Sequence, residues 1–344
     1  MSDWFALLKA HGATVADGAI VDFGDPIGEL AAARAGSIVA HLSHLGLLQF
    51  SGADAVAFLH GQVSSDIRGL GTTQGRYGGY CTPKGRLLAN FLLWRDGEGV
   101  LMLLSRDVLS GVEKRLRMYV LRSKVTISDA TEDFVVIGAS GPAAPDTVTA
   151  ALGTPAPATT FGLARTESGT VAIRIPGDRF IVVANRAEAE GVWTQLAQAL
   201  QPVGIASWQW LEIVNGLPLV TAAIQDELVP QMANLELVGG VSFDKGCYPG
   251  QEIVARSQYL GQVKRRTFRA HIVGSEAPRA GEPLYEGGDA TQTAGIIVNA
   301  APSPEGGYDV LAVLQKAAAE RGDLHLRAPD GPALRLLPLP YAIP

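Results

Sequence analysis

Apolar residues in the N-terminal third alternate between helical and strand-like spacing. From Ser51 onward they recur every three or four residues, which indicates a helix that Gly61 interrupts and that Ser51 and Asp54 would cap as a capping box. A glycine-rich stretch at 69–80 is interpreted as a turn. Two continuous apolar runs then predict buried strands, 86–94 and 99–105. A second helix is expected where four apolar residues share one face: Val108, Val112, Leu116 and Val120.

The rest of the chain predicts a second sheet-and-helix unit and a β-rich end. Residues 140–160 are rich in proline, alanine and threonine, which indicates a domain edge or a long surface loop. A hairpin with a Pro-Gly-Asp turn is expected over 171–184, and a helix over 187–200. Beyond Arg266 short apolar runs predict a C-terminal β-barrel or sandwich. The pattern is that of an α+β or α/β protein.

Composition and charge restrict the functions that this chain can have. Of its 344 residues 47% are hydrophobic and 18% are charged, as in soluble globular proteins, and the length suggests two or three domains. A formal net charge of −6 argues against a protein that coats nucleic acid. No signal sequence or long apolar segment is recognisable. We therefore expect a cytoplasmic protein with no membrane and no direct nucleic-acid partner.

Cys247 lies in the polar sequence KGCYPGQE, at residues 245–252. A nearby cation and exposed backbone NH groups stabilise a thiolate, and Lys245, Gly246 and Gly250 could supply them. The alternative is a buried, inert cysteine, which the polar neighbours make less attractive without excluding it. Cys81 enters an apolar strand, so we expect it to be such a small hydrophobic residue.

Other candidate residues carry weaker signals. His41 and His44 form a single HxxH pair, which falls short of a four-ligand zinc site, so no metal site is predicted. Ser207 is expected to cap a short helix that ends near residue 215. Glu212, within this helix, suits a ligand with paired N–H donors such as a pterin ring, while a solvated helical glutamate is the simpler alternative. The basic run 264–269 suits either an anionic ligand tail or a solvated strand face.

Several stretches together resemble the YgfZ-type folate-binding proteins of the glycine-cleavage T-protein (aminomethyltransferase) superfamily. They are GADAVAFLHGQVSSDI from Gly52, CTPKGRLLANF from Cys81, WLEIVNGLP from Trp210 and the run from Leu228 to Arg266 that contains KGCYPGQE. The resemblance covers most of the chain. It implies an α+β fold of three domains in a ring around a central folate channel, with a C-terminal β-barrel.

The resemblance also implies how the domains divide the chain. An N-terminal α+β folate-binding domain would span 1–128 and be completed by a return segment, 203–260, that carries KGCYPGQE. A small sheet-and-helix domain would occupy 129–202, and the β-barrel 261–344. Tetrahydrofolate or a derivative would then lie against Glu212 and the KGCYPGQE segment.

The function implied by the resemblance is that of an accessory protein. With tetrahydrofolate it would support the assembly or repair of iron-sulfur clusters in client enzymes, including some that modify tRNA. Folate and iron-sulfur client or assembly proteins are its expected partners, and turnover by the protein itself is not required. The matching positions give Cys247 and Lys245 as the chemical residues and Glu212 and Arg256 as folate-binding residues. The remaining motif residues are Gly246, Tyr248, Gly250, Gln251 and Glu252.

One departure separates the chain from the T-proteins, which carry an acidic pair after a double glycine. The corresponding stretch here, KGRLLANFLL, offers Ala89 and Asn90, so the positioned acid or base is missing. A folate-dependent aminomethyltransferase or one-carbon transferase is therefore the second hypothesis, and a purely structural role for the cysteine segment is the third. One cysteine cannot hold a 4Fe-4S cluster alone. Cys247 thus stays open as an iron ligand, a nucleophile or a redox sensor.

Overall fold

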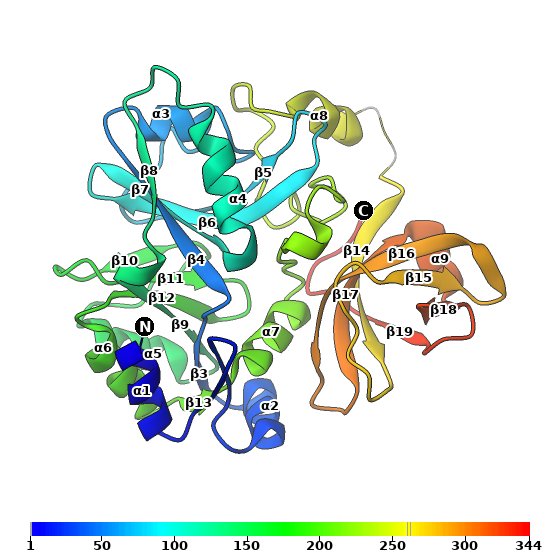
Figure 1. The fold of residues 1–344 in the computed structure, drawn as a ribbon, viewed down its shortest axis with the longest axis horizontal. Helices are drawn as coiled ribbons and strands as arrows, with labels where there is room; N and C mark the ends of the chain where they lie inside the picture. The colour runs from blue at the N-terminus through cyan, green and yellow to red at the C-terminus, as the bar shows by residue number, and fades with distance from the viewer. Residues whose placement is uncertain (1, 260, 262) are drawn as a thin grey trace.

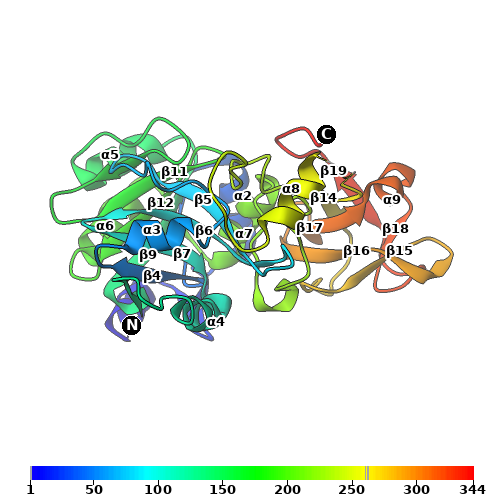
Figure 2. The same cartoon turned by 90° about the horizontal axis from the view of Figure 1, so that it is seen from above.

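The computed structural model describes residues 2–259, 261 and 263–344. Met1 and Leu260, which bound two of the predicted domain segments, and Gln262 lie outside the described residues. The chain forms three large sheets with helices packed against them, and a small hairpin of β1 (Thr14–Ala16) and β2 (Ala19–Asp22). Figure 1 shows two of the sheets one above the other on the left, and both Figure 1 and Figure 2 place the C-terminal sheet beside them on the right. The α+β class is confirmed.

The first sheet is antiparallel and has the strand order β5-β6-β7-β4-β8. Helix α4 (Arg106–Arg117) packs its apolar side chains against it, although the helix ends before Val120. The strand pair and the helix predicted for this region are therefore confirmed. The strands are β4 (Leu45–Ser51), β5 (Arg76–Cys81), β6 (Leu87–Asp96), β7 (Gly99–Ser105) and β8 (Thr126–Asp129).

The helix predicted from Ser51 is short, and its predicted cap is wrong. Helix α3 spans only Ala55–His60 and ends at Gly61, where a break was expected, and the helical spacing of apolar residues after Gly61 does not form a helix. Asp54 is the N-cap residue but makes no capping hydrogen bond with its side chain. Its carboxylate instead accepts a hydrogen bond from the backbone NH of Lys124, 2.7 Å away. A contact made across the fold thus replaces the local one that the sequence suggests.

The glycine-rich stretch 69–80 is only partly a turn, because its second half forms strand β5. A Cβ on Gly78 would lie 2.8 Å from the ring of Phe91, and one on Gly79 would lie 2.7 Å from the side chain of Leu87. These glycines therefore let β5 approach the large side chains of β6. Their role is close packing and not chain reversal.

The second sheet has the strand order β10-β11-β12-β9-β3-β13. Three helices share an apolar core with one of its faces: α1 (Ser2–Ala10), α5 (Ala144–Leu152) and α6 (Ala189–Ala197). The hairpin of β11 and β12 and the helix α6 confirm the prediction. The strands are β3 (Ile38–His41), β9 (Phe134–Ser140), β10 (Leu163–Arg165), β11 (Val171–Ile175), β12 (Arg179–Asn185) and β13 (Gln201–Val203).

The surface loop predicted over 140–160 is wrong for its central part, which is helix α5. A proline lies in the first turn of this helix, where its missing NH is not needed. Val148 and Leu152 bury one face of the helix, and Gly153 ends it with φ +66°. Proline and alanine here start and continue a helix, which is why composition alone misleads.

Helix α7 (Ile205–Val214) lies between the second sheet and the C-terminal sheet (Figure 1). It begins after Gly204, so Ser207 does not cap it and lies buried within the helix. Its predicted end is confirmed, since Asn215 is the C-cap residue. Buried Glu29 of helix α2 (Pro26–Ala35) accepts a hydrogen bond from the backbone NH of Gly204, 2.7 Å away. This carboxylate satisfies the start of α7 in place of a local cap.

The third sheet, of order β18-β15-β16-β17-β14-β19, is antiparallel and curves as a half-barrel, which confirms the coarser part of the barrel prediction. Helix α8 (Gln251–Tyr259) precedes it, and helix α9 (Lys316–Arg321) interrupts it. Two short 3-10 helices, η1 (Thr131–Asp133) and η2 (Ala222–Ile224), lie in the connections. The strands are β14 (Arg265–Ile272), β15 (Pro283–Glu286), β16 (Asp289–Pro302), β17 (Tyr308–Gln315), β18 (Leu324–Leu326) and β19 (Leu334–Leu337).

A buried carboxylate joins the third sheet to α7. Asp309 of β17 accepts hydrogen bonds from Trp210 Nε1 at 3.1 Å, from Arg269 at 2.7 Å and from His271 at 2.8 Å. Burial alone would raise the pKa of Asp309, but these donors hold the pKa below its usual value. Arg266 is likewise paired with buried Glu236. Two arginines of the basic run 264–269 thus pair with carboxylates inside the protein. The predictions of an anionic ligand tail or a solvated strand face did not include this role.

The sheets do not follow the predicted domain limits everywhere. Strand β3, from the N-terminal region, pairs with β9 and with β13 in the second sheet. The domain bounds 1–128, 129–202, 203–260 and 261–344 stay predictions. Over the part of the chain that the structure describes, no helix has the length and apolar character needed to cross a membrane.

Gly138→Ala is expected to destabilise the protein, because a Cβ on this β9 residue would lie 2.5 Å from the ring of fully buried Trp208. Overpacking of this kind lowers the free energy of unfolding by about 1–3 kcal/mol, which urea denaturation measures. Gly191→Ala in α6 is the matched control, since its added Cβ would meet open space; helix propensity predicts a gain of about 0.5–1 kcal/mol. Equal stabilities would contradict the packing of α7 on β9.

Candidate functional site

The segment Lys245–Glu252, hereafter the cysteine loop, is anchored by the buried side chain of Lys245. Its ammonium donates hydrogen bonds to the backbone carbonyls of His60 and Val63, at and just beyond the end of α3, and lies 5.0 Å from the ring centre of Tyr248. Burial lowers the pKa of Lys245 to about 8. The ammonium therefore fixes the loop to the first sheet and its helix. An electrostatic role toward Cys247 stays a prediction.

Tyr248 and Gly250 hold the second half of the loop. Tyr248 is buried, and burial raises the pKa of its hydroxyl group well above the usual value. Gly250 has φ +83°, and a Cβ there would lie 2.5 Å from the backbone carbonyl oxygen of Thr82. Only glycine permits this close approach to the turn at 82–85. Three of the predicted motif residues thus have structural reasons for their positions.

Between these anchors Gly246 and Cys247 are exposed. The Nε2 atom of His60 would lie 3.7 Å from a Cβ on Gly246, and burial, followed by the charge of Lys245, lowers the pKa of His60. A largely neutral imidazole therefore borders the loop, which the sequence did not indicate. Cys247 is not the buried, inert cysteine of the alternative prediction. Cys81, in contrast, is buried as predicted, and burial raises the pKa of its thiol to about 12.

The last predicted motif residues lie on α8. Gln251 is half-buried, while Glu252 and Arg256 are exposed. The carbonyl of Val254 accepts a hydrogen bond from the side chain of buried Gln231, 2.7 Å away, which fixes the helix. A folate-binding role for Arg256 stays a prediction.

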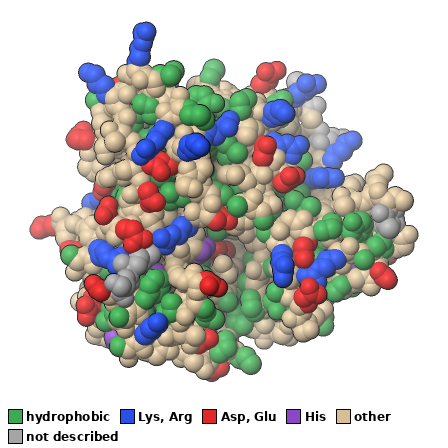
Figure 3. Space-filling model, viewed as in Figure 1, with side chains coloured by type: hydrophobic (Ala, Val, Ile, Leu, Met, Phe, Trp, Pro, Cys, Tyr) green, Lys and Arg blue, Asp and Glu red, His purple; other side chains and the backbone are tan. Residues whose placement is uncertain are grey.

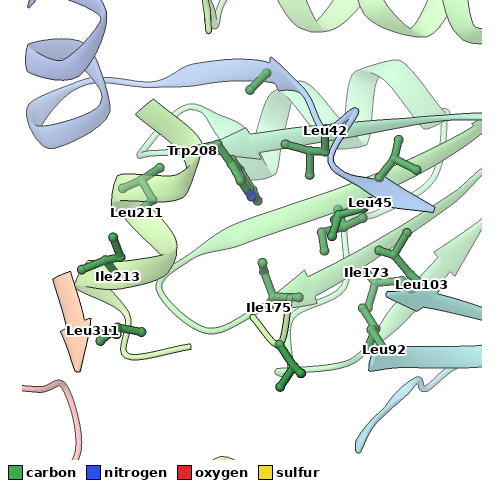
Figure 4. Close-up of a cluster of buried hydrophobic side chains, with 14 of the residues drawn as sticks. Leu42, Leu45, Leu92, Leu103, Ile173, Ile175, Trp208, Leu211, Ile213 and Leu311 are labelled. Carbon is green, nitrogen blue, oxygen red and sulfur yellow. The ribbon is translucent and has the colours of Figure 1, made fainter. Parts of the chain in front are cut away.

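A small cavity, hereafter the inner cavity, lies between the first two sheets and beside α7. Its volume is about 70 Å³. Its apolar wall includes Leu92 and Leu103 of the first sheet and Ile175 of the second sheet, which Figure 4 shows within one cluster of buried hydrophobic side chains. Four polar or charged side chains also line it: Tyr77, Asn90, Arg179 and Glu212. An apolar space with a few inward-facing polar groups is typical of a ligand site.

A larger, open cavity of about 490 Å³, hereafter the outer cavity, adjoins the inner cavity at Glu212 and Leu219, which line both. Residues 43–44, 105–107 and 298–300 contribute to its wall, so the first and third sheets meet there. Figure 3 shows the surface hollowed where the lobes of the molecule come together. The outer cavity is within the usual volume range of ligand sites, about 300–1,000 Å³, whereas the inner cavity is smaller.

Glu212, a predicted binding residue, stands at the junction of the two cavities. Its Oε1 atom accepts a hydrogen bond from Trp208 Nε1 at 3.1 Å and lies 3.8 Å from His44 Nε2. The side chain is 19% exposed, so it faces the cavities and is not the solvated glutamate of the simpler alternative.

Two residues that line the inner cavity escaped the sequence analysis. Arg179 is fully buried at the start of β12, and its guanidinium lies 5.2 Å from the ring centre of Trp208. Tyr77 stacks on Phe161 with ring centres 5.8 Å apart. The only signal for Arg179 is a charge at the first position of an apolar strand, where an exposed side chain is the usual outcome.

Asn90 lines the inner cavity and is held at both ends of its amide. Its Oδ1 accepts a hydrogen bond from the backbone NH of Val220, and its Nδ2 donates to the carbonyl of Pro218, each at 2.7 Å. A carboxylate could not donate to Pro218. The side chain is thus a neutral, fixed amide without acid-base function.

The predicted site residues fall into two separate groups. Glu212 faces the cavities, whereas none of the described residues of the cysteine loop lines either one. A ligand that touches both Glu212 and the cysteine loop stays a prediction. Among the residues described, no three His, Cys, Asp or Glu side chains are grouped to hold a metal ion. Burial, then the nearby His44 and Arg106, lowers the pKa of His41 to about 3, so the first histidine of the HxxH pair is neutral.

A thiol reagent is expected to modify one cysteine in the native protein and both after unfolding, because Cys247 is exposed and Cys81 is buried. A chromogenic disulfide reagent counts the thiols in each state. Cys247→Ser should leave no rapidly reacting thiol in the native protein. Rapid reaction of two thiols in the native wild type would contradict the burial of Cys81.

Asn90→Asp is expected to lower the free energy of unfolding at pH 7 by about 1–3 kcal/mol, since a buried donor is lost and the Pro218 carbonyl then faces a carboxylate. Chemical denaturation gives the difference. Unchanged stability would show that the amide is not fixed as the hydrogen bonds indicate.

The comparisons with known proteins agree with this architecture. The GCVT N-terminal domain family matches residues 22–238. A "tRNA-modifying protein YgfZ" from Yersinia pseudotuberculosis is 33% identical over 299 residues, which is 86% of this chain and 90% of that protein. The protein of the same name from Yersinia enterocolitica is 31% identical over 298 residues, again 86% of this chain and 90% of the relative.

A solved structure shares the fold over nearly the whole chain. The glycine cleavage system aminomethyltransferase T from Bartonella henselae superposes with a TM-score of 0.81 and 19% sequence identity, covering 98% of this chain and 96% of that one. At this identity the likeness concerns the fold alone. Taken with the match over 22–238 and the YgfZ relatives, it leads to one conclusion: the chain belongs to the YgfZ proteins of the GCVT family.

Proposed function

We propose that this protein binds tetrahydrofolate or a derivative and, with Cys247, supports the assembly or repair of iron-sulfur clusters in client enzymes, including tRNA-modifying ones. The observation that carries the proposal is the pairing of an exposed thiol on a firmly anchored loop with a separate cavity system that Glu212 lines. The tRNA-modifying relatives support the choice of clients. We place the protein in the cytoplasm, with no membrane and no direct nucleic-acid partner.

The cavities support the folate part of the proposal. The inner and outer cavities lie where the lobes meet, as a central channel in a ring of three domains would, and the T-protein-like fold is compatible with such a ring. Glu212 supplies a carboxylate that can accept two N–H groups from a pterin ring, and the aromatic pair Tyr77 and Phe161 supplies a flat apolar wall. Bound tetrahydrofolate would supply N5 of its reduced ring and the exocyclic N10, the two nitrogens that carry one-carbon units.

Cys247 supports the iron-sulfur part of the proposal. Its exposure lets a partner approach, and Lys245 and Gly250 keep the loop in one conformation. Because one thiol cannot hold a 4Fe-4S cluster, the remaining ligands would come from a client or an assembly protein. The thiol would act on the cluster as an iron ligand, as a sulfur nucleophile or as a redox sensor.

Aminomethyl or other one-carbon transfer is the second candidate function, and the T-protein fold favours it. Against it stands Asn90, whose amide is fixed by Pro218 and Val220 and cannot move a proton. A purely structural role for the cysteine loop is weaker still, because the exposed thiol is not part of the core.

The proposal is tested by titrating tetrahydrofolate into the wild type and into Cys247→Ser by calorimetry, with 4Fe-4S enzyme activity measured in cells that carry each version. We expect folate binding to be retained in Cys247→Ser, because the loop does not line the cavities, and cluster-enzyme activity to be lost. Stability of the variant should stay within about 0.5 kcal/mol of the wild type, as for other surface substitutions.

Each alternative predicts a different result. Normal cluster-enzyme activity with Cys247→Ser would refute the role of the thiol, and no binding of tetrahydrofolate would refute the role of folate. Turnover that requires the glycine-cleavage carrier protein and tolerates Cys247→Ser would favour the transferase. A clear loss of stability in Cys247→Ser would favour the structural role.

A further inference from the structure

Arg179 is a buried cation with most of its hydrogen-bonding capacity unused. The side chain is 0% exposed, and among the described residues neither Nη1 nor Nη2 has a hydrogen-bond partner. Only Nε is engaged, with the backbone carbonyl of Pro176 at 3.0 Å, while the face of Trp208 lies against the guanidinium. Buried charges in proteins are normally paired, so an unpaired guanidinium at the wall of a cavity indicates a missing partner.

The nearest opposite charge does not fill this role. Arg179 and Glu212 both line the inner cavity, and Glu212 opposes the burial that lowers the pKa of Arg179 to about 10. The guanidinium is therefore charged at neutral pH. Yet within the described residues no ion pair at 4.0 Å or less joins the two side chains. Trp208 contacts both: Arg179 lies over its ring and Glu212 accepts its Nε1–H.

The backbone around Arg179 keeps the guanidinium in place. It follows a turn at 176–178 in which Gly177 has φ +84°, and a Cβ on Gly177 would lie 2.0 Å from the side-chain oxygen of Asn215, at the end of α7. The turn is thus packed tightly against the helix that carries Glu212. The cation and the carboxylate thus line one cavity from two elements that are packed against each other, a preorganised arrangement.

We propose that Arg179 and Glu212 together recognise the lactam edge of the pterin ring, with Arg179 donating to the 4-oxo group and Glu212 accepting from N3–H and the 2-amino group. This inference rests on the proposed folate binding and deepens it by naming the atoms that are read. This edge of the ring has one hydrogen-bond acceptor, the 4-oxo group, beside two donors, N3–H and the 2-amino group. The guanidinium of Arg179 can donate to the acceptor, and the carboxylate of Glu212 can accept from both donors. Arg179 is a binding and specificity-determining residue, and no catalytic step is assigned to it.

The dimensions of the cavities are compatible with entry of the ring edge first. The inner cavity, about 70 Å³, is too small for a whole folate, whereas the adjoining outer cavity, about 490 Å³, has room for its remainder. Glu212 lies at the junction, so an edge that reaches Arg179 passes it. The guanine base carries the same acceptor-donor-donor edge, and the test below separates the two sources.

The test compares the wild type with Arg179→Met and Arg179→Lys by calorimetric titration. The probes are tetrahydrofolate, its 4-amino-4-deoxy analogue and guanosine. Arg174→Met is the matched control, because Arg174 lies on the neighbouring strand, is paired with Asp178 and does not line the inner cavity. Thermal unfolding of each ligand-free protein is recorded in parallel.

We expect Arg179→Met to weaken tetrahydrofolate binding by about 10- to 100-fold, the usual effect of losing a hydrogen bond from a charged group. The wild type should prefer tetrahydrofolate to the 4-amino analogue by at least about tenfold, because an amino group cannot accept from Arg179, and Arg179→Met should lose this preference. Ligand-free Arg179→Met should unfold at or above the wild-type temperature, since an unpaired buried charge is removed. Arg179→Lys should retain part of the affinity.

Failure of this inference and failure of folate binding give different results. If the wild type binds tetrahydrofolate and Arg179→Met binds it within twofold, the role of Arg179 is refuted while folate binding stands. If the wild type does not bind tetrahydrofolate, both are refuted. Tighter binding of guanosine than of tetrahydrofolate would refute the pterin assignment. Should Arg179→Met fail to fold, equal affinity of the wild type for the 4-oxo and 4-amino compounds would refute the inference without any variant.

Discussion

The centre of this protein depends on the burial of helix α7 between sheets that come from different parts of the chain. Trp208 packs on Gly138 of the second sheet, and Trp210 donates a hydrogen bond to Asp309 of the third. The segment after the helix is held by Asn90 of the first sheet. With these contacts fixing the rotation of α7, Glu212, one turn beyond Trp208, is left facing the cavities. Packing therefore decides where the carboxylate is presented.

Among the described residues, Arg179 differs from the other buried charges considered above in how far the fold satisfies it. Glu29, Lys245 and Asp309 each have hydrogen-bond partners and join segments that are distant in sequence. Arg179 has only one such bond, although it is equally buried. The three paired groups stabilise the architecture, because breaking these contacts would leave a charge unpaired. A buried charge with few partners, such as Arg179, lowers stability, and proteins retain such groups where binding requires them.

Local sequence patterns were sufficient for the strands β6, β7, β11 and β12, and insufficient for β5 and for the cavities. Runs such as 86–94 and 99–105 are apolar enough to specify buried strands. The polar context of Cys247 left a buried cysteine open, and the structure shows an exposed one. Helix α5 was not predicted, because a segment rich in proline has the composition of a loop even when the proline lies in the first turn of a helix. The inner cavity could not be found, since its wall joins residues from 45 to 219 and Arg179 is distinguished only by burial that tertiary packing creates.

The anchoring of the cysteine loop ties the presentation of the thiol to completion of the whole fold. Lys245 meets the carbonyl of His60 across a sequence separation of 185 residues. Such a long-range contact closes a large loop, and it cannot form before the chain has been synthesised as far as Lys245. A nascent or misfolded chain would not hold Cys247 at this position. The position of the thiol is thus a property of the complete tertiary fold and not of the local sequence around Cys247.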